Sequence, residues 1–126
     1  MRLAQVCRDV RGASAVEFAL TAPVFLMMVL GIVECGLLLW TQLGLQHGVE
    51  MAARCASIDA KTCGSVSDTQ KYAAQKAYGL KPPSSVFTVS TPACGSQVSA
   101  SYTVQFITTY FGTPSLTLSA RSCFPK

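Results

Sequence analysis

The chain has 126 residues, half of them hydrophobic, with a mean hydropathy of +0.38, six Cys and a formal net charge of +4. A soluble domain of this length rarely has a positive mean hydropathy, so the composition favours one small domain joined to a membrane-bound segment. Removing residues 1–12, which carry three Arg and one Asp, lowers the net charge from +4 to +2. A charge excess of this size does not indicate nucleic acid as a partner.

The apolar residues concentrate in residues 18–40, where the only ionisable side chains are Glu34 and the thiol of Cys35. A helix rises about 1.5 Å per residue, so a helix over this stretch crosses the roughly 30 Å hydrocarbon core of a bilayer. The stretch therefore predicts a transmembrane helix.

Basic residues precede this stretch, because Arg2, Arg8 and Arg11 stand there against a single acid, Asp9. Positive charge is retained on the cytoplasmic side of a membrane helix, so we expect residues 1–12 in the cytoplasm and the C-terminal part outside it. The sequence predicts a single-pass protein of the bacterial inner membrane.

One long helix is expected over residues 13–58. Pro23 removes one hydrogen bond from it, which transmembrane helices tolerate better than soluble ones. The only histidine, His47, is expected as a surface residue of the exposed part of the helix. Beyond the apolar stretch the helix becomes amphipathic, with apolar residues at spacings of four, three and four. These residues are Leu45, Val49, Ala52 and Ala56.

Residues 59–126 are expected to form a small outer domain. After a turn, Ser67 and Asp68 open a short helix over residues 69–78, with Gly79 as its C-terminal cap.

Residues 98–106 alternate apolar with polar side chains at period two, which predicts a half-buried strand. Phe87 and Val89 mark a strand before it, and residues 116–120 mark one after it, with turn residues between them. The simplest pairing is a three-stranded antiparallel meander. The expected fold class is α+β: a long N-terminal transmembrane helix that continues into an outer domain with a short helix and this sheet, stapled by disulfides.

The exported part contains four cysteines, and an oxidising compartment favours disulfides between them. In a meander, the turn after the first strand and the end of the third strand lie at the same end of the sheet, so Cys94 can reach Cys123. The other two then close a short turn at the end of the long helix. Of the three connectivities that four cysteines allow, this one needs the least backbone rearrangement. Cys7 and Cys35 are expected as free thiols. The four exported cysteines are Cys55, Cys63, Cys94 and Cys123.

Residues 11–18 read Arg-Gly-Ala-Ser-Ala-Val-Glu-Phe. This stretch resembles a class III prepilin signal, in which a membrane aspartyl prepilin peptidase cuts after the Gly on the cytoplasmic side. The resemblance implies a leader of residues 1–12 and a cut between Gly12 and Ala13, with Glu17 and Phe18 as the acid–aromatic pair that follows. It also implies that Glu17 offsets the new α-amino group of a neighbouring subunit during assembly. An isolated Glu17 would be an ordinary interfacial acid, but the order of leader charge, Gly, Glu, aromatic and apolar stretch favours the pilin interpretation.

A longer resemblance, to the TadE-like domain, covers residues 11–54. It rests on residues 11–20, on Ala22 and Pro23, on residues 31–34 with Gly36, and on the small residues before Arg54. Cys35 departs from the family pattern, in which an aromatic residue often precedes that Gly. TadE-like proteins are minor pseudopilins of the Tad system, which builds Flp-type, type IVc adhesive pili for surface attachment and biofilm formation. The expected function is therefore that of a minor pseudopilin. The implied partners are the prepilin peptidase, other pseudopilins and the major pilin, the inner-membrane assembly platform and membrane lipid.

Glu34 lies about 24 Å along the helix from Phe18, toward the outer leaflet. Its carboxylate could extend to the outer headgroups. Alternatively, it pairs inside the membrane with a basic group of another pseudopilin or of the platform, because an unpaired charge in lipid is costly.

Two other classes of protein are weighed against this function. The exported part has no catalytic triad and no phosphate-binding loop, and Cys55 and Cys63 are too far apart for a paired Cys-x-x-Cys zinc site. We therefore expect no enzyme activity, no metal and no cofactor. The alternative is a single-pass, signal-anchored extracytoplasmic binding protein. It is disfavoured because the apolar stretch is longer than that of a signal peptide and contains Pro23 and Glu34.

Overall fold

The structure, a computed structural model, describes residues 10–79, 81–106, 112 and 115–125, with side chains from Gly12 onward. The chain divides into two compact units, Met1–Cys35 and Gly36–Lys126. The expected α+β fold class is confirmed. The elements are helix α2 (Val10–Ile58), helix α3 (Val66–Lys76), the 3₁₀ turn η1 (Ser84–Val86) and strands β1 (Phe87–Ser90), β2 (Ser96–Gln105) and β3 (Ser115–Phe124).

Helix α2 begins at Val10, three residues earlier than expected, so Gly12 lies inside the helix. A single glycine costs a helix only about 1 kcal/mol relative to alanine, which does not suffice to end it. The expectations for residues 1–9, including the free thiol of Cys7, lie outside the described residues.

Helix α3 also begins earlier than expected, because its N-cap is Ser65 and not Ser67 or Asp68. The Ser65 hydroxyl accepts a hydrogen bond from the Asp68 N–H at 3.1 Å and donates to Asp68 Oδ2 at 2.6 Å. Ser65 is therefore an ordinary N-cap. The Asp68 carboxylate binds the Ser65 hydroxyl, whereas in a capping box it would bind the Ser65 N–H. The helix ends at Lys76 with Ala77 as its C-cap, two residues before the expected end, and Gly79 lies beyond the cap with a φ of 76°.

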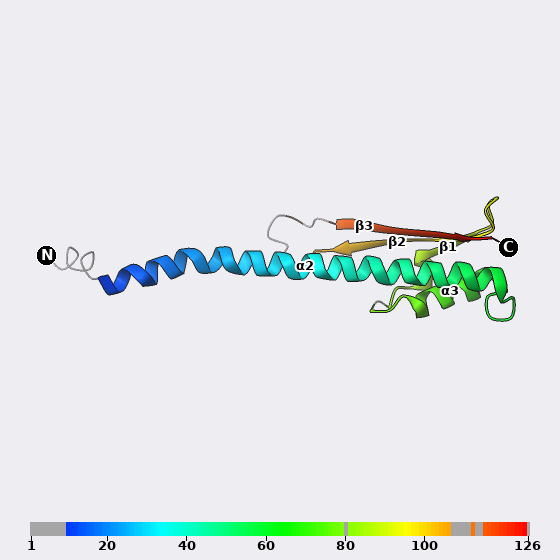
Figure 1. The fold of residues 1–126 in the computed structure, drawn as a ribbon, viewed down its shortest axis with the longest axis horizontal. Coiled ribbons are helices and arrows are strands. Elements are labelled where there is room, and N and C mark those ends of the chain that lie inside the picture. Colours follow the sequence, from blue (N-terminus) through cyan, green and yellow to red (C-terminus); the bar gives the residue numbers. More distant parts are fainter. Residues whose placement is uncertain (1–9, 80, 107–111, 113–114, 126) are drawn as a thin grey trace. The chain divides into compact units, whose positions relative to one another are not determined.

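The sheet is the expected antiparallel meander, in the order β1-β2-β3. Val98 in β2 pairs with Val89 in β1 and with Ser122 in β3. Alternate residues of β2 are buried, as the period-two pattern predicts. Figure 1 shows the strands running beside the outer part of α2, and a hydrogen bond of 2.9 Å from Gln42 Nε2 to the carbonyl oxygen of Ser119 joins β3 to that helix.

The core of the second unit lies where α2, α3 and the sheet meet. The expected α2 face is correct at Leu45, Val49 and Ala52, but Ala53 is fully buried whereas Ala56 is only half-buried. Residues four and eight positions after Leu45 stay on one face of a helix, and Ala56 lies a turn further on, where the chain prepares to leave α2. The buried cluster comprises Leu45, Val49, Ala52, Ala53, Ala73, Ala77, Phe87, Val98, Ala100 and Ala120.

Helices α2 and α3 approach each other closely and run antiparallel. A Cβ added at Gly48 would lie 2.8 Å from the carbonyl oxygen of Ala73 and 3.1 Å from the Cβ of Ala77. Glycine and alanine at this crossing let the two backbones come together, which no larger side chain permits.

The disulfides have the pairing that the sequence favours, Cys55 with Cys63 and Cys94 with Cys123, at Cα separations of 5.8 and 6.3 Å. Both lie at the end of the unit where α2 finishes, because the Ser57 hydroxyl donates to the carbonyl oxygen of Pro125 close to the end of β3. Covalent links therefore close this end of the second unit, which we call the outer unit after its expected place outside the cytoplasm.

The Gly48 crossing gives a stability prediction. Gly48→Ala should lower the free energy of unfolding by about 1–2 kcal/mol, because overpacking costs about 1–3 kcal/mol and the helix propensity of alanine returns part of it. Thermal and chemical unfolding of the purified full chain in detergent, followed by circular dichroism, measures the change. Gly36→Ala is the matched control, since a Cβ there meets no described atom within 4 Å. Equal stability of the two variants would contradict the close crossing.

Candidate functional site

The four residues of the expected processing and assembly site, Gly12, Ala13, Glu17 and Phe18, all lie on α2 and are exposed. Ala13 and Glu17 are four positions apart, so they occupy the same face of the helix, on neighbouring turns. A carboxylate on Glu17 is therefore within reach of the backbone nitrogen that a cut after Gly12 would release.

The fold itself does not require glycine at position 12. A Cβ added there would meet nothing within 4 Å among the described residues. The glycine also weakens the first turns of α2, which have no acidic residue to complement the helix dipole. The N-terminal turns are therefore the part of α2 that opens most readily.

Thr21 and Pro23 follow this site. The Thr21 hydroxyl lies 2.9 Å from the carbonyl oxygen of Glu17 and 3.3 Å from that of Phe18. Pro23 has no N–H, so the carbonyl of Ala19 lacks its usual partner four residues on. A hydroxyl that bonds back to the preceding turn bends a helix slightly, so two local perturbations follow one another here.

The side chains of the apolar stretch are largely exposed: apart from the half-buried Leu38, its large hydrophobic residues range from 38% exposure at Val29 to 72% at Phe18. Helix α2 contains an 18-residue window of mean hydropathy 2.3, of which none is buried. Burying a Leu, Val or Phe side chain is worth about 1.5–3 kcal/mol, so this surface requires lipid or another subunit around it. The helix fits a single-pass membrane anchor.

Two residues of the stretch interrupt its apolar character. Glu34 is half-buried and Cys35 is exposed with a free thiol. The pairing expected of Glu34 with another subunit stays a prediction.

Comparison with known protein families gives one match. The family model of TadE-like proteins matches residues 12–54, which is the apolar stretch with its preceding Gly12 and the first part of the outer unit. Residues 12–54 are TadE-like. The match extends over almost the same residues as the resemblance in the sequence. No curated protein and no solved structure matches the chain.

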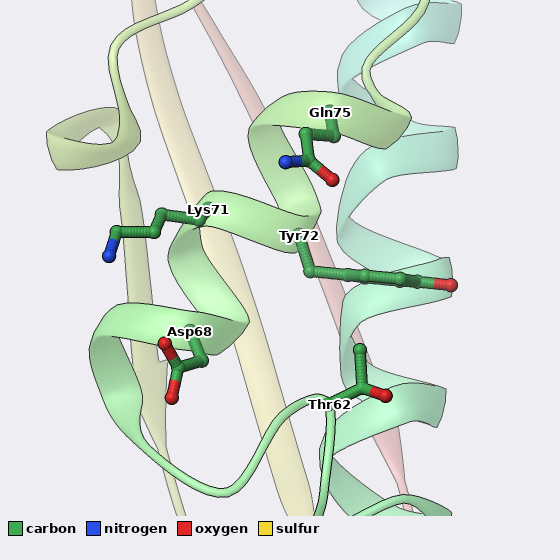
Figure 2. A pocket seen from close by; sticks show the side chains of 5 residues that line it. All are labelled: Thr62, Asp68, Lys71, Tyr72 and Gln75. Atoms are coloured by element: carbon green, nitrogen blue, oxygen red, sulfur yellow. The ribbon is translucent and has the colours of Figure 1, made fainter.

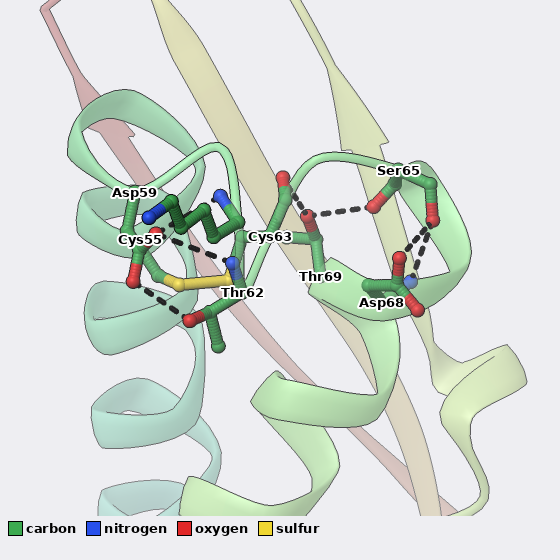
Figure 3. Close-up of a disulfide and its surroundings, with 8 residues drawn as sticks. Cys55, Asp59, Thr62, Cys63, Ser65, Asp68 and Thr69 are labelled. Atoms are coloured by element: carbon green, nitrogen blue, oxygen red, sulfur yellow. Dashed lines mark hydrogen bonds between the residues drawn. A yellow bond between two sulfur atoms is a disulfide. The ribbon is translucent and has the colours of Figure 1, made fainter.

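The TadE-like segment ends at residue 54, near the end of α2 and directly before Cys55. The Cys55–Cys63 disulfide closes the turn that leads from α2 to α3 (Figure 3). Asp59 organises this turn. Its carboxylate accepts hydrogen bonds from the N–H groups of Lys61 and Thr62 at 3.0 and 3.2 Å and from the Thr62 hydroxyl at 2.7 Å. The turn thereby brings Cys63 back beside Cys55.

These contacts also change the acidity of Asp59. The hydrogen bond from the Thr62 hydroxyl, followed by those from the two backbone N–H groups, lowers the pKa of Asp59 below its ordinary value. A lowered pKa in the folded state means that the charged form stabilises the fold. That contribution is present above the ordinary Asp pKa and is lost as the pH falls through the lowered one.

A shallow depression lies against α3, between the turn and the middle of the helix (Figure 2). Lys71 extends away from Tyr72 in this view, and the side chains do not converge on one point. No group of three metal-ligating side chains is found within the described residues. The depression is lined by Thr62, Asp68, Lys71, Tyr72 and Gln75.

At the opposite end of α3, an aromatic contact joins the helix end to the TadE-like segment. The rings of Trp40 and Tyr78 meet edge to face with centroids 5.7 Å apart, and His47 lies 5.1 Å from Tyr78. His47 is half-buried, and its Nδ1 lies 3.0 Å from the carbonyl oxygen of Lys76. A carbonyl only accepts, so His47 donates from Nδ1 and caps the C-terminal end of α3. His47 thus stays at the surface, but it is half-buried and has a hydrogen-bond partner at the end of α3.

Local sequence gives no signal for this contact. His47 and Lys76 are 29 residues apart, and nothing in the pattern around either residue indicates the other. Near this contact the sequence singles out Gly79, but as a helix cap and not as a contact of α2. In the structure a Cβ at Gly79 would lie 1.9 Å from Trp40 Nε1, so glycine lets the chain pass the indole ring.

The Asp59 turn gives a prediction on pH. Thr62→Val removes the hydroxyl donor that lowers the Asp59 pKa most, so the pKa should rise toward its ordinary value of about 3.9. NMR titration of the Asp59 carboxyl in the full chain in detergent measures both values. Thr103→Val, which removes an exposed hydroxyl on β2, is the control and should leave the titration unchanged. An unchanged Asp59 midpoint in Thr62→Val would mean that the hydroxyl does not stabilise the carboxylate.

Proposed function

We propose that this protein is a minor pseudopilin of a Tad-type (Flp, type IVc) pilus system, processed by prepilin peptidase, which takes part in pilus biogenesis and surface adhesion. The observation that supports this most directly is the TadE-like match, which begins at Gly12 and runs through the whole apolar stretch. The helix exposes its apolar side chains, which suits storage in a bilayer followed by packing among other pilin helices.

The processing step is a cut of the peptide bond between Gly12 and Ala13 on the cytoplasmic side of the membrane. A protease cleft accepts extended backbone, and these residues are helical in the intact chain. The first turns of α2 must therefore unwind, and glycine at position 12 lowers the free energy of doing so. The released chain begins at Ala13.

A cut at Gly12 gives Glu17 a partner. The new α-amino group carries a positive charge near neutral pH, and a carboxylate at the edge of an apolar helix is most stable when paired. The partner is the α-amino group of a neighbouring subunit, which would fix the axial register of the two helices. Pairing within one chain is the competing arrangement, since Ala13 and Glu17 share a helix face.

The processing proposal predicts the mature N-terminus. Intact-mass analysis of the protein from cells that contain the cognate prepilin peptidase should give a chain that starts at Ala13. Gly12→Leu should abolish the cut. Gly31→Leu is the matched control, because a Cβ at Gly31 also meets nothing within 4 Å and the residue lies on the same helix. A mature protein that starts at Met1, or beyond Leu30, would reject the proposal in favour of a plain signal anchor or signal peptide.

A measurement of pilus assembly distinguishes the role of Glu17 from that of the cleavage site. Glu17→Gln keeps the shape of the side chain and removes its charge, so it should still be cut but should enter pili or pilus-assembly complexes far less well. Quantifying the protein in sheared pili and in crosslinked membrane complexes measures this. Normal incorporation of Glu17→Gln would show that the carboxylate does not set the register.

Glu34→Gln in the same assay tests the intramembrane pairing. A loss of particular crosslinked partners is expected if Glu34 pairs with a basic group of another pseudopilin or of the platform. Full assembly with an unchanged set of partners would instead assign Glu34 to the outer headgroups.

A further inference from the structure

The C-terminal end of α3 lies at the level where the apolar stretch ends. Trp40 is the last residue of that stretch, and aromatic residues at this position favour the boundary between lipid and water. Gly79 passes directly against the Trp40 indole, and Tyr78 packs edge to face on it. Two parts of the chain that are almost forty residues apart in sequence therefore meet at one depth.

We name this surface the interfacial patch: Trp40, Tyr78, Gly79 and Lys81. Trp40 is 53% and Tyr78 44% exposed, and Lys81 is exposed as well. Exposed Trp and Tyr beside Lys is the combination that anchors membrane proteins among lipid headgroups, because each side chain has an apolar body and a polar end.

The charge of this end of the unit favours an anionic partner. Residues 69–126 contain no Asp or Glu and five basic residues, so no carboxylate of this part neutralises Lys81. The nearest acids along the chain, Asp59 and Asp68, belong to the turn and the N-cap at the opposite end of α3. The C-terminal end of α3 thus carries Lys76 and Lys81 without an acid from residues 69–126, whereas Lys61 accompanies the two acids of the other end.

Two lysines lie near this end of α3, and Lys81 indicates an anionic ligand more strongly than Lys76 does. The Lys76 ammonium lies 5.4 Å from the centre of the Tyr72 ring, one turn back toward the start of α3. A lysine in the last turn also complements the helix dipole, which accounts for Lys76 without a ligand. Neither explanation applies to Lys81, which lies five residues beyond the end of the helix.

We propose that the interfacial patch is a second membrane anchor, which docks the outer unit on anionic phospholipid headgroups of the outer leaflet of the inner membrane. It rests on the membrane insertion of the apolar stretch but not on processing at Gly12 or on pilus assembly. Trp40 and Tyr78 insert at headgroup depth, and Lys81 binds lipid phosphate. One lysine near an anionic leaflet changes occupancy about fivefold at low salt.

The experiment uses the full chain, isotopically labelled, in nanodiscs of phosphatidylcholine with or without phosphatidylglycerol. A small fraction of the lipids carries a paramagnetic chelate on the headgroup, and NMR relaxation reports which amides lie near it. The amides of Tyr78, Gly79 and Lys81 should relax several-fold faster than those of Asp68 and Lys71, and the difference should be larger with phosphatidylglycerol.

Two charge-matched variants complete the test. Lys81→Gln should reduce the extra relaxation in phosphatidylglycerol, whereas Lys71→Gln removes the same charge from the middle of α3 and should leave it unchanged. Equal relaxation at both ends of α3 would overturn the proposal. Equal loss in the two variants would also overturn it, because it would indicate a general effect of net charge.

A second copy of the chain is the other occupant that the test recognises. The amides of Tyr78 and Gly79 could be protected from the paramagnetic headgroups only when a nanodisc holds two chains, and to the same extent with and without phosphatidylglycerol. That result would assign the patch to a contact between subunits and reject lipid docking. Absence of cleavage at Gly12 would leave these relaxation results unaffected, so the two proposals fail independently.

Discussion

The outer unit depends on how closely two helices approach each other at Gly48. The chain offers few large side chains to a core, and most of the buried residues are alanine or valine. Each small residue contributes little transfer free energy when it is buried. Small side chains also let the backbones pack at short distance, so dispersion contacts between the backbones take the place of large buried side chains. Because α3 sits so near α2, the carbonyl of Lys76 comes within reach of His47, and Gly79 comes against Trp40.

A core this small explains why the covalent links are placed where they are. Both disulfides lie at the end of the unit where α2 finishes, the first closing the turn to α3 and the second tying the loop after β1 to the end of β3. In the chain-entropy model, loops closed over 8 and 29 residues contribute about 2.5 and 3.6 kcal/mol. At the other end of the unit, aromatic contacts and single hydrogen bonds join α3 to α2. Because these contacts are weaker than covalent links, the structure of this end can change with its surroundings.

Much of this fold could be predicted because its signals are local. Alternation along residues 98–106 gave the central strand and the meander, and the meander in turn gave the partner of Cys94. The start of α3 was misplaced because Ser65 and Ser67 are equally good N-cap residues by type, and the bond from the Asp68 N–H selects Ser65. The hydrogen bond of His47 could not be predicted, because its partner carbonyl is reached only through the tertiary packing of α2 on α3.

The candidate site was predicted from a different kind of signal than the fold. Gly12 and Glu17 were found from a motif, and the structure around them offers no packing reason for either residue. Residues that a fold does not need, in a spacing that a family shares, are best explained by a partner outside the chain. The cysteine pairing, by contrast, follows from the fold of the chain itself.

The two ends of the outer unit suggest how such a protein could leave the membrane. A helix that is to be extracted must exchange lipid for neighbouring apolar helices, and this exchange is nearly neutral for side chains that are equally apolar in both places. The polar contacts of the unit with the leaflet would then decide when extraction occurs. An anchor made of one lysine and two aromatic rings is weak enough to be released by a competing protein surface, yet it would hold the outer unit against the membrane until that surface arrives. The disulfide-closed end needs no such partner, so it keeps its structure through the transfer.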